Sequence, residues 1–397
     1  MRHLLIFSIF TFICACTSPK KAEPKEFELP LSQQMADSEI KRTPDPRLLD
    51  FRPKPKWEYT NGLVCLAMYK VWDKTGEDKY LDYVRFYYDS MVNVDGSIKT
   101  YKMRDFNIDR VNPGKALILL SKVDPKPKYN MAIDSLRKQM KGHPRTSEGG
   151  FWHKKRYPSQ MWLDGLYMGS PFLAQYAVNY NEPEIFADVA NQFRLINKYL
   201  WNEEEQLYYH GWDESREQKW SNPETGLSPH FWGRAMGWFA MATVDVLDYM
   251  PEDHPGRKEV MLAVERIATG IKKHQDSETG VWWQVLNLPD KDGNYREASC
   301  TSMFTYFLLK ALKKGYLSDE YNQVATDAYN GILDQFIKEN EDGTISLTNV
   351  CAVAGLGGNP YRDASYEYYI GEPQRDNDPK AIGPFIMASL LWEEREK

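Results

Sequence analysis

Cysteine and histidine are scarce in this chain of 397 residues, which contains 5 Cys and 7 His. None of them has the spacing of a zinc site. The chain also lacks a phosphate-binding loop, a dinucleotide-binding glycine motif, a nucleophile elbow and a kinase signature. The sequence therefore predicts a protein that uses no metal and no cofactor.

The chain has no excess of positive charge either. It carries 50 Lys and Arg against 56 Asp and Glu, which gives a formal net charge of −6. A protein with this balance has no general attraction for nucleic acid. An anionic ligand would have to be held by local Arg, Lys and His side chains.

Long apolar runs are absent except at the start of the chain. Residues 4–15 form an apolar run that is too short to span a bilayer as a mature helix, so residues 1–16 read as a targeting segment. Ala15 followed by Cys16 resembles a bacterial lipoprotein signal. The expected product is a periplasmic or cell-surface lipoprotein, anchored in the membrane by a lipid on Cys16. An ordinary signal peptide on a soluble secreted protein is the alternative.

The rest of the chain divides into two parts. Residues 17–55 are rich in Pro, Lys and Glu and are predicted to form a tether followed by an arm that lies on the domain. Residues 56–397 are predicted to form one domain. It contains only Cys65, Cys300 and Cys351, so at least one thiol is free and no disulfide framework is implied.

A helical pattern repeats along this domain. The unit is an apolar helix, a turn, an amphipathic helix and an acidic loop that contains glycine. Apolar helices are predicted near residues 59–72, 162–180, 234–249 and 301–314, and amphipathic helices near 76–91, 183–200, 255–274 and 319–338. Repeated helical hairpins predict an all-α protein, with inner and outer helices closed into a six-hairpin (α/α)6 barrel. An open solenoid is the alternative.

The stretch at residues 143–171 gathers two Trp, two Tyr and two His around Asp164. Its flanking residues Leu163 and Leu166 are apolar, and an apolar setting raises the pKa of a carboxyl group. A carboxyl group with a raised pKa can donate a proton and take it back. The alternative is that Asp164 merely caps a helix.

Other candidate residues lie in this stretch and in three further clusters. Asp109 is a second candidate carboxylate or a helix cap, while His153 and His210 are candidate ligand contacts or packed residues. Trp232 and Arg234 lie at a helix start, where Trp can face a sugar ring and Arg can clamp a carboxylate at two points. The alternative is a core Trp and an Arg paired with an internal Asp. His, Trp, Arg and a few acids without a metal cluster indicate carbohydrate chemistry.

Several of these motifs resemble glycoside hydrolase family 105, the unsaturated rhamnogalacturonyl hydrolases. The motifs are QMWLDGLYMGSPFLAQYA, GGFWHK, YYHGWDES, HFWGRAMGWFAMATVDVLDYMP and GNPYRDASYEYYIGEPQRDNDPK. The resemblance runs from about Trp57 to the C-terminus and implies an (α/α)6 barrel. It also implies removal of a 4,5-unsaturated uronic acid from the non-reducing end of lyase-generated oligosaccharides. In this reaction an Asp protonates C4 and helps water to attack C5, and the resulting hemiketal collapses.

The resemblance assigns roles to particular residues. Asp164 matches the catalytic Asp, and Asp109 matches the second active-site Asp. The positions that match sugar contacts are His153, His210, Trp232 and Arg234, with Tyr59 as an aromatic residue near the pocket. By its charge, Arg234 is expected to hold the carboxylate of the substrate, with the two His residues assisting.

The expected substrate is unsaturated galacturonyl-rhamnose from rhamnogalacturonan. Unsaturated glucuronyl ends of ulvan, glycosaminoglycan or arabinogalactan fragments are an alternative, and a non-catalytic glycan-binding lipoprotein is another. Ala235, Met236 and Cys300 replace residues that are usual in the family. They lie beside the pocket motifs, so they are expected to influence which leaving sugar is accepted.

Overall fold

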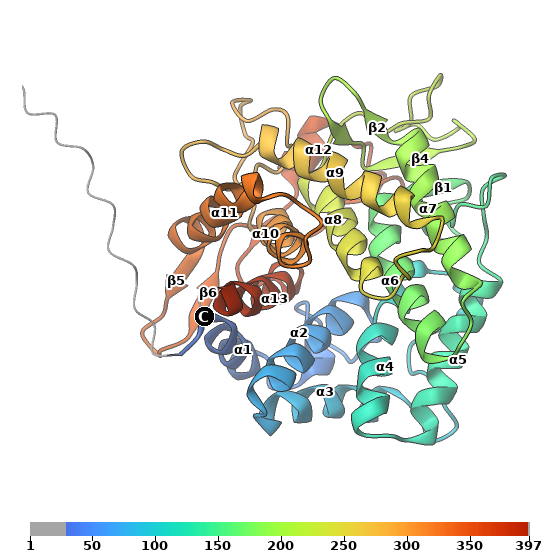
Figure 1. Cartoon of the computed structure of the whole chain (residues 1–397), viewed down its shortest axis with the longest axis vertical. Helices are drawn as coiled ribbons and strands as arrows, with labels where there is room; N and C mark the ends of the chain where they lie inside the picture. Colours follow the sequence, from blue (N-terminus) through green and yellow to red (C-terminus); the bar gives the residue numbers. More distant parts are fainter. Residues whose placement is uncertain (1–28, 396–397) are drawn as a thin grey trace, which may run out of the picture.

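The computed structural model describes residues 29–395, which form two concentric rings of helices (Figure 1). The predicted signal segment with Cys16, and the start of the predicted tether, lie outside the described residues. The inner ring consists of α2 (Tyr59–Thr75), α4 (Gly114–Val123), α6 (Leu163–Asn179), α8 (Gly233–Leu247), α10 (Ala298–Lys313) and α13 (Pro379–Arg395). The outer ring consists of α1 (Leu31–Arg42), α3 (Asp78–Met91), α5 (Pro127–Lys141), α7 (Ile185–Tyr199), α9 (Arg257–Lys273) and α11 (Asn322–Gln335).

The inner ring is closed. Each inner helix contacts the next, and α13 returns to contact α2. Each outer helix packs mainly on one inner helix, and α1 packs mainly on α13, so the two ends of the described chain complete the sixth hairpin. This closure confirms the predicted (α/α)6 barrel and rules out the open solenoid.

Burial explains the division into two rings. All fifteen residues of α8 are buried, as expected for a helix covered on every side. On the outer helix α9, Val260, Val264, Ile267 and Ile271 are buried at spacings of three and four residues, which places them on one face. The paired apolar and amphipathic helices predicted from the sequence are all present. The sequence patterns did not locate α5 and α13, nor α1, which lies inside the segment interpreted as a tether and arm.

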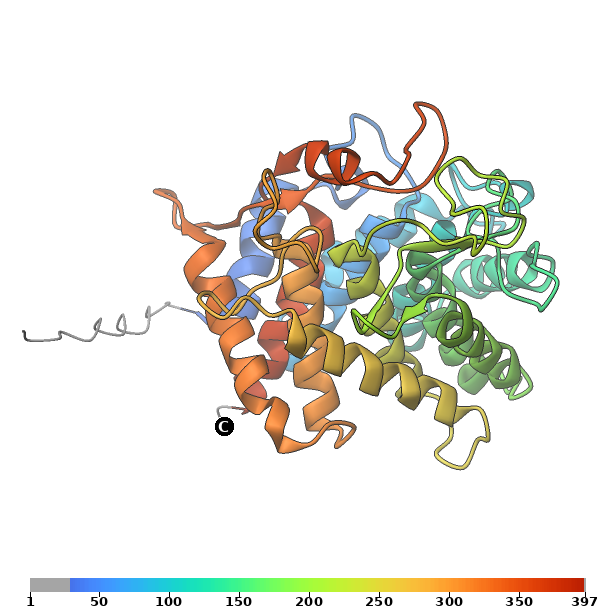
Figure 2. The same cartoon turned by 90° about the horizontal axis from the view of Figure 1, so that it is seen from above.

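Short antiparallel strands tie the loops together. β1 (Gln160–Trp162) pairs with β4 (Gly211–Asp213), with Trp162 opposite Gly211. The other pairs are β2 (Trp201–Asn202) with β3 (Leu207–Tyr208), β5 (Ile337–Glu339) with β6 (Ile345–Leu347), and β7 (Val350–Cys351) with β8 (Gln374–Arg375). Figure 2 shows the long loop that carries α12 (Tyr366–Gly371) and the loop after α1 rising at the same end of the barrel. The hydrogen-bonded loops give this end a fixed shape.

Cys65, Cys300 and Cys351 are all buried and free. Within residues 29–395, no helix is both long enough and apolar enough to cross a membrane.

Close packing between α2 and the start of α4 gives a test of this architecture. A Cβ atom at Gly62 would lie 2.5 Å from the backbone Cα of Pro113, so we expect Gly62→Ala to lower the free energy of unfolding by about 1–3 kcal/mol. Gly371→Ala is the matched control, because its Cβ would meet no atom within 4 Å. Denaturant unfolding measures both, and equal values would contradict the tight α2–α4 approach.

Candidate active site

The residues singled out in the sequence gather where the inner helices begin. Tyr59 is the first residue of α2, Asp164 the second residue of α6 and Arg234 the second residue of α8. Asp109 lies in a short 3-10 turn before α4. The amino ends of helices carry partial positive charge, so this end of the barrel favours an anionic ligand.

Asp164 is paired with His210. The Nε2 atom of His210 lies 3.2 Å from Oδ2 of Asp164, and its Nδ1 atom lies 2.7 Å from the hydroxyl of Tyr369. Burial raises the pKa of Tyr369 well above its ordinary value, so its hydroxyl stays protonated and can donate to Nδ1. When Nδ1 accepts this bond, an N–H of His210 lies at Nε2, on the side of Asp164. His210 has no exposed surface, whereas the Asp164 side chain is 14 % exposed.

The structure corrects the expected pKa of Asp164. Burial is the largest single effect and opposes ionisation of this carboxyl group, but the contact with His210 and the electrostatic effects of His210 and His153 together hold its pKa below the ordinary value. The apolar residues beside Asp164 in the sequence suggested a raised pKa. His210 is distant in the sequence and is brought to Asp164 by the fold, which reverses the direction.

Asp109 forms a second carboxylate–histidine pair. Its Oδ1 atom lies 3.4 Å from Nε2 of His153, and its Oδ2 atom lies 2.5 Å from Nζ of Lys154. Burial, together with the positive charge of Lys154, lowers the pKa of His153 well below its ordinary value. His153 is therefore a neutral imidazole near pH 7, able to donate or accept one hydrogen bond.

Trp162 joins the two pairs. His153 stacks on the Trp162 ring with centroids 4.2 Å apart, and His210 meets the same ring edge-on at 5.6 Å. Tyr157 also stacks against Trp162, at 5.0 Å. The two carboxylates are thus held around one aromatic wall.

A cavity of about 790 Å³ opens beside Asp109. Tyr59 and Lys154 also line it, together with part of the segment before α2. Trp232 does not line this cavity. It is buried against His210 and Tyr369, at ring separations of 4.9 and 5.9 Å, and its indole N–H donates to Gln284. Its packing helps to fix the position of His210.

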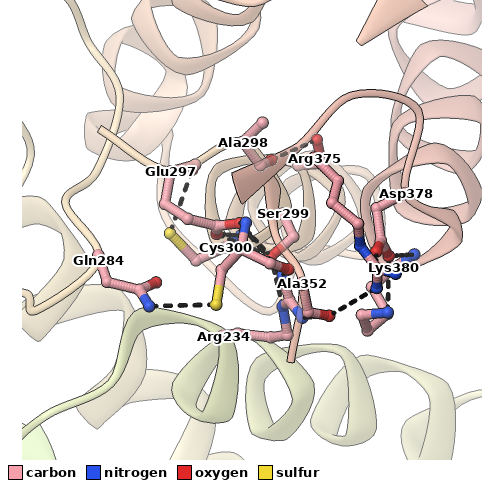
Figure 3. A network of polar contacts seen from close by, with 12 residues as sticks. Arg234, Gln284, Glu297, Ala298, Ser299, Cys300, Ala352, Arg375, Asp378 and Lys380 are labelled. Carbon is pink, nitrogen blue, oxygen red and sulfur yellow. Dashed lines mark hydrogen bonds and ion pairs between the residues drawn. The ribbon is translucent and has the colours of Figure 1, made fainter. Parts of the chain in front are cut away.

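Arg234 lies in a separate polar network (Figure 3). Its guanidinium is 1 % exposed and lies 3.2 Å from the carboxylate of Glu297, the N-cap of α10. It also donates to Oγ of Ser299 at 2.6 Å and to the backbone oxygens of Cys351 and Ala352. The structure thus presents Arg234 as half of an internal ion pair, the alternative considered above, although the acid is a Glu and not an Asp.

The three residues expected to influence the leaving sugar are also internal. Ala235, Met236 and Cys300 have no exposed surface. Their side chains therefore have no direct contact with a ligand in the cavity.

The structure adds residues that the sequence reading did not assign. Lys154 contacts Asp109, Tyr369 contacts His210, and Arg362 donates to the hydroxyl of Tyr157 at 2.8 Å. Arg362 and Tyr369 come from a loop rich in Gly and Tyr to which no separate chemistry was given. The many aromatic and charged residues in this loop were the feature of the sequence that could have marked it as part of the site. Within residues 29–395, no group of three or more His, Cys, Asp or Glu is placed to hold a metal ion.

A closed barrel of helical hairpins, with acids and aromatic rings where its inner helices begin, suits a carbohydrate-active hydrolase. Comparison with known proteins supports this class. The model described as Glycosyl Hydrolase Family 88 matches residues 31–395, and the chain belongs to this family of glycoside hydrolases. A solved structure of a family 105 glycoside hydrolase from C. acetobutylicum is 44 % identical, has a TM-score of 0.89, and covers 92 % of this chain and 100 % of that chain.

Two curated proteins are also similar. Protein Atu3128 of Agrobacterium fabrum is 39 % identical over 227 residues, which cover 56 % of this chain and 96 % of that protein. The unsaturated rhamnogalacturonyl hydrolase YesR of Bacillus subtilis is 24 % identical over 317 residues, which cover 78 % of this chain and 84 % of that protein.

The internal position of Arg234 predicts a large effect on stability. We expect Arg234→Met to lower the free energy of unfolding by about 3–5 kcal/mol, because it removes the only positive side chain that pairs with the buried Glu297 in the described part of the chain. Lys74→Met removes a partly exposed ion pair with Glu394 and should cost about 0–1 kcal/mol. If Arg234→Met lowered the free energy of unfolding no more than Lys74→Met and only raised KM, Arg234 would instead be a substrate-binding residue.

The contact between His210 and Asp164 predicts a change in titration. In His210→Phe the contact that does most to lower the pKa of Asp164 is gone and burial remains, so we expect this pKa to rise and the carboxyl to stay protonated up to higher pH. NMR titration of the Asp164 carboxyl measures the shift. His143→Phe is the matched control, since His143 is buried but bonded to the backbone of Trp152. If the pKa of Asp164 is unchanged in His210→Phe, His210 is not what lowers it.

Proposed function

We propose that this glycoside hydrolase removes a 4,5-unsaturated uronic acid from the non-reducing end of oligosaccharides made by polysaccharide lyases. The observation that carries the proposal is the arrangement of two carboxylates, Asp109 and Asp164, each beside a buried histidine and both around Trp162. The printed name of YesR, an unsaturated rhamnogalacturonyl hydrolase, supports the choice of substrate.

The reaction needs one proton and one water molecule. Asp164 gives its proton to C4 of the unsaturated ring, and water adds to C5 as Asp164 takes a proton back. The hemiketal formed at C5 opens to a ketone, and the hemiacetal left at C1 releases the leaving sugar. His210, held by Tyr369, keeps the Asp164 carboxyl aimed at the ring.

Substrate binding can reverse the ionisation of Asp164. Without substrate its pKa is lowered, so the carboxyl is ionised near neutral pH. The substrate brings a carboxylate of its own and excludes water, and both effects raise the pKa of a nearby carboxyl group. Asp164 would then take up a proton as the substrate binds. Asp109 acts in the same direction, because its negative charge already opposes ionisation of Asp164.

Lys154 is our candidate to hold the carboxylate of the substrate. It lines the cavity, it lies 2.5 Å from Asp109, and the amino ends of the inner helices add positive potential around it. Unsaturated galacturonyl-rhamnose remains the proposed substrate. The lipid anchor on Cys16 and a periplasmic or cell-surface location remain predictions from the sequence.

Loss of the C4=C5 double bond provides the test. We expect Asp164→Asn to lower kcat on unsaturated galacturonyl-rhamnose by about 10²–10⁴-fold, because the amide cannot supply the proton. The ultraviolet absorbance of the double bond measures turnover. Asp105→Asn is the matched control, since Asp105 is a carboxylate that lines the cavity beside Asp109, and it should keep most of the activity.

The outcomes separate the alternatives. Turnover by the parent protein that is lost only in Asp164→Asn supports the proposal. If the absorbance stays unchanged with this disaccharide but an unsaturated glucuronyl substrate is turned over, the proposed reaction stands. The polysaccharide from which the substrate derives would then be a different one. Binding without any turnover by the parent protein would indicate a glycan-binding protein and would overturn the enzymatic proposal.

A further inference from the structure

We propose that a small cavity between the second halves of the inner helices binds one monatomic anion, of the size of chloride, through the ammonium group of Lys115 and the side-chain amide of Gln175. A layer of aromatic rings separates this cavity from the candidate active site. Tyr59 lines the cavity beside the catalytic acids and contacts Trp238, which stacks on Tyr167. The inference goes beyond the proposed function and does not rest on it.

The cavity has a volume of about 40 Å³ and is distinct from the cavity beside Asp109. Residues of α2, α4, α6 and α8 line it, among them Lys70, Lys115 and Gln175. Asp248, which also lines it, is exposed, so an ion can enter from the surface. A cavity of this size has room for one monatomic anion or about two or three water molecules, and it is too small for a sugar acid.

Two buried donors that line this cavity have no hydrogen-bond partner among residues 29–395. They are Nζ of Lys115 and Nε2 of Gln175, whose residues are 3 % and 2 % exposed. Nζ of Lys115 lies 3.3 Å from the centroid of the Tyr167 ring, so the ring covers one side of the ammonium group. A buried donor without an acceptor costs free energy, and native proteins rarely leave one unsatisfied. One acceptor in the cavity would serve both donors.

The charges around the cavity favour an anion over water as this acceptor. The two carboxylates that line it, Asp245 and Asp248, are both paired with Lys310, at 2.6 Å each. The two ammonium groups that line it, Lys70 and Lys115, form no ion pair within the described part of the chain. Water would accept a hydrogen bond from Lys115 but would leave its buried charge uncompensated, which is costly. An anion would compensate it.

Anion binding is coupled to protonation of Lys115. Burial lowers the pKa of Lys115 to about 7; the charge of Asp245 opposes this effect, and the charges of Lys310 and Lys70 add to it. The other charged groups on the surrounding helices are Asp73, Asp248 and Lys314, and the tyrosines Tyr167, Tyr249 and Tyr306 stay protonated because burial raises their pKa. An anion beside Nζ favours the charged amine, so binding raises the pKa of Lys115. Above pH 7 the free site loses its proton, and its affinity for an anion falls.

Thermal unfolding of the full mature protein in sodium chloride, compared with sodium gluconate at the same ionic strength, tests the site. Gluconate is too large for the cavity. A ligand that binds only the folded state raises Tm as its concentration increases. For a dissociation constant of about 10 mM, we expect about 100 mM chloride to raise Tm by about 1–3 °C. Both salts screen exposed charges equally, so the difference between them reports the anion.

Substitutions locate the anion. Lys115→Met removes the ammonium group and keeps a long side chain, so the difference in Tm between chloride and gluconate should disappear. Gln175→Leu should weaken chloride binding by about tenfold, because a hydrogen bond to a charged group is lost. Lys122→Met is the matched control. Lys122 lies on the same helix, α4, but is exposed and outside the cavity, so the effect of chloride should remain.

Two measurements on the parent protein do not depend on how a variant folds. In crystals grown with bromide, anomalous scattering should show a peak beside Nζ of Lys115 and Nε2 of Gln175. The affinity for chloride, followed by the line width of its NMR signal, should fall by about fivefold between pH 7 and pH 8. The reason is that a smaller fraction of Lys115 then carries a proton.

Equal Tm values in chloride and gluconate, or no bromide peak at Lys115, would overturn the inference and leave water as the acceptor. An effect of chloride that is the same in Lys115→Met as in the parent protein would also overturn it, because the anion would then bind elsewhere. None of these results bears on the proposed function, since none of them measures turnover of an unsaturated substrate.

Discussion

Closure of the inner ring is the constraint on which the rest of the structure depends. The contact of α13 with α2 makes the six inner helices neighbours in a circle. The residues of the candidate site are far apart in the sequence, yet they meet because each precedes or begins an inner helix. The same arrangement brings the partial positive charges of the helix ends together. An anionic ligand is therefore favoured at this end before any particular cation is considered.

Side chains fill the middle of the barrel, so the cavity beside Asp109 is confined to the end where the inner helices begin. Trp238 of α8 lies 6.1 Å from Tyr59 and stacks on Tyr167 at 4.9 Å. Beyond these rings, Lys310 pairs with Asp245 at 2.6 Å. Aromatic rings and buried ion pairs thus separate the two ends of the barrel. Arg234 and Glu297 belong to the same internal framework, and they hold the backbone of Cys351 and Ala352 beside the cavity.

Much of this organisation could be read from the sequence. Helix positions followed from apolar periodicity because burial on one face or on all faces leaves a local pattern. Asp164, Asp109, His153 and His210 were recognisable by the motifs around them. Lys154 and Tyr369 were not, because nothing local shows which charge or hydroxyl will face a distant partner. The pKa of Asp164 was predicted in the wrong direction for the same reason.

The sequence by itself determined the class of fold and the family, and it pointed to the carboxylates and histidines of the candidate site, since periodicity and motifs depend on residues close together in the chain. Only the tertiary structure decided how they are paired. It placed His210 against Asp164, enclosed Arg234 with Glu297, and set Phe51 into the wall of the cavity. Ion pairing, burial and pKa depend on distances of a few ångströms in space. Those distances are fixed by closure of the ring and by loop pairing between segments far apart in the sequence.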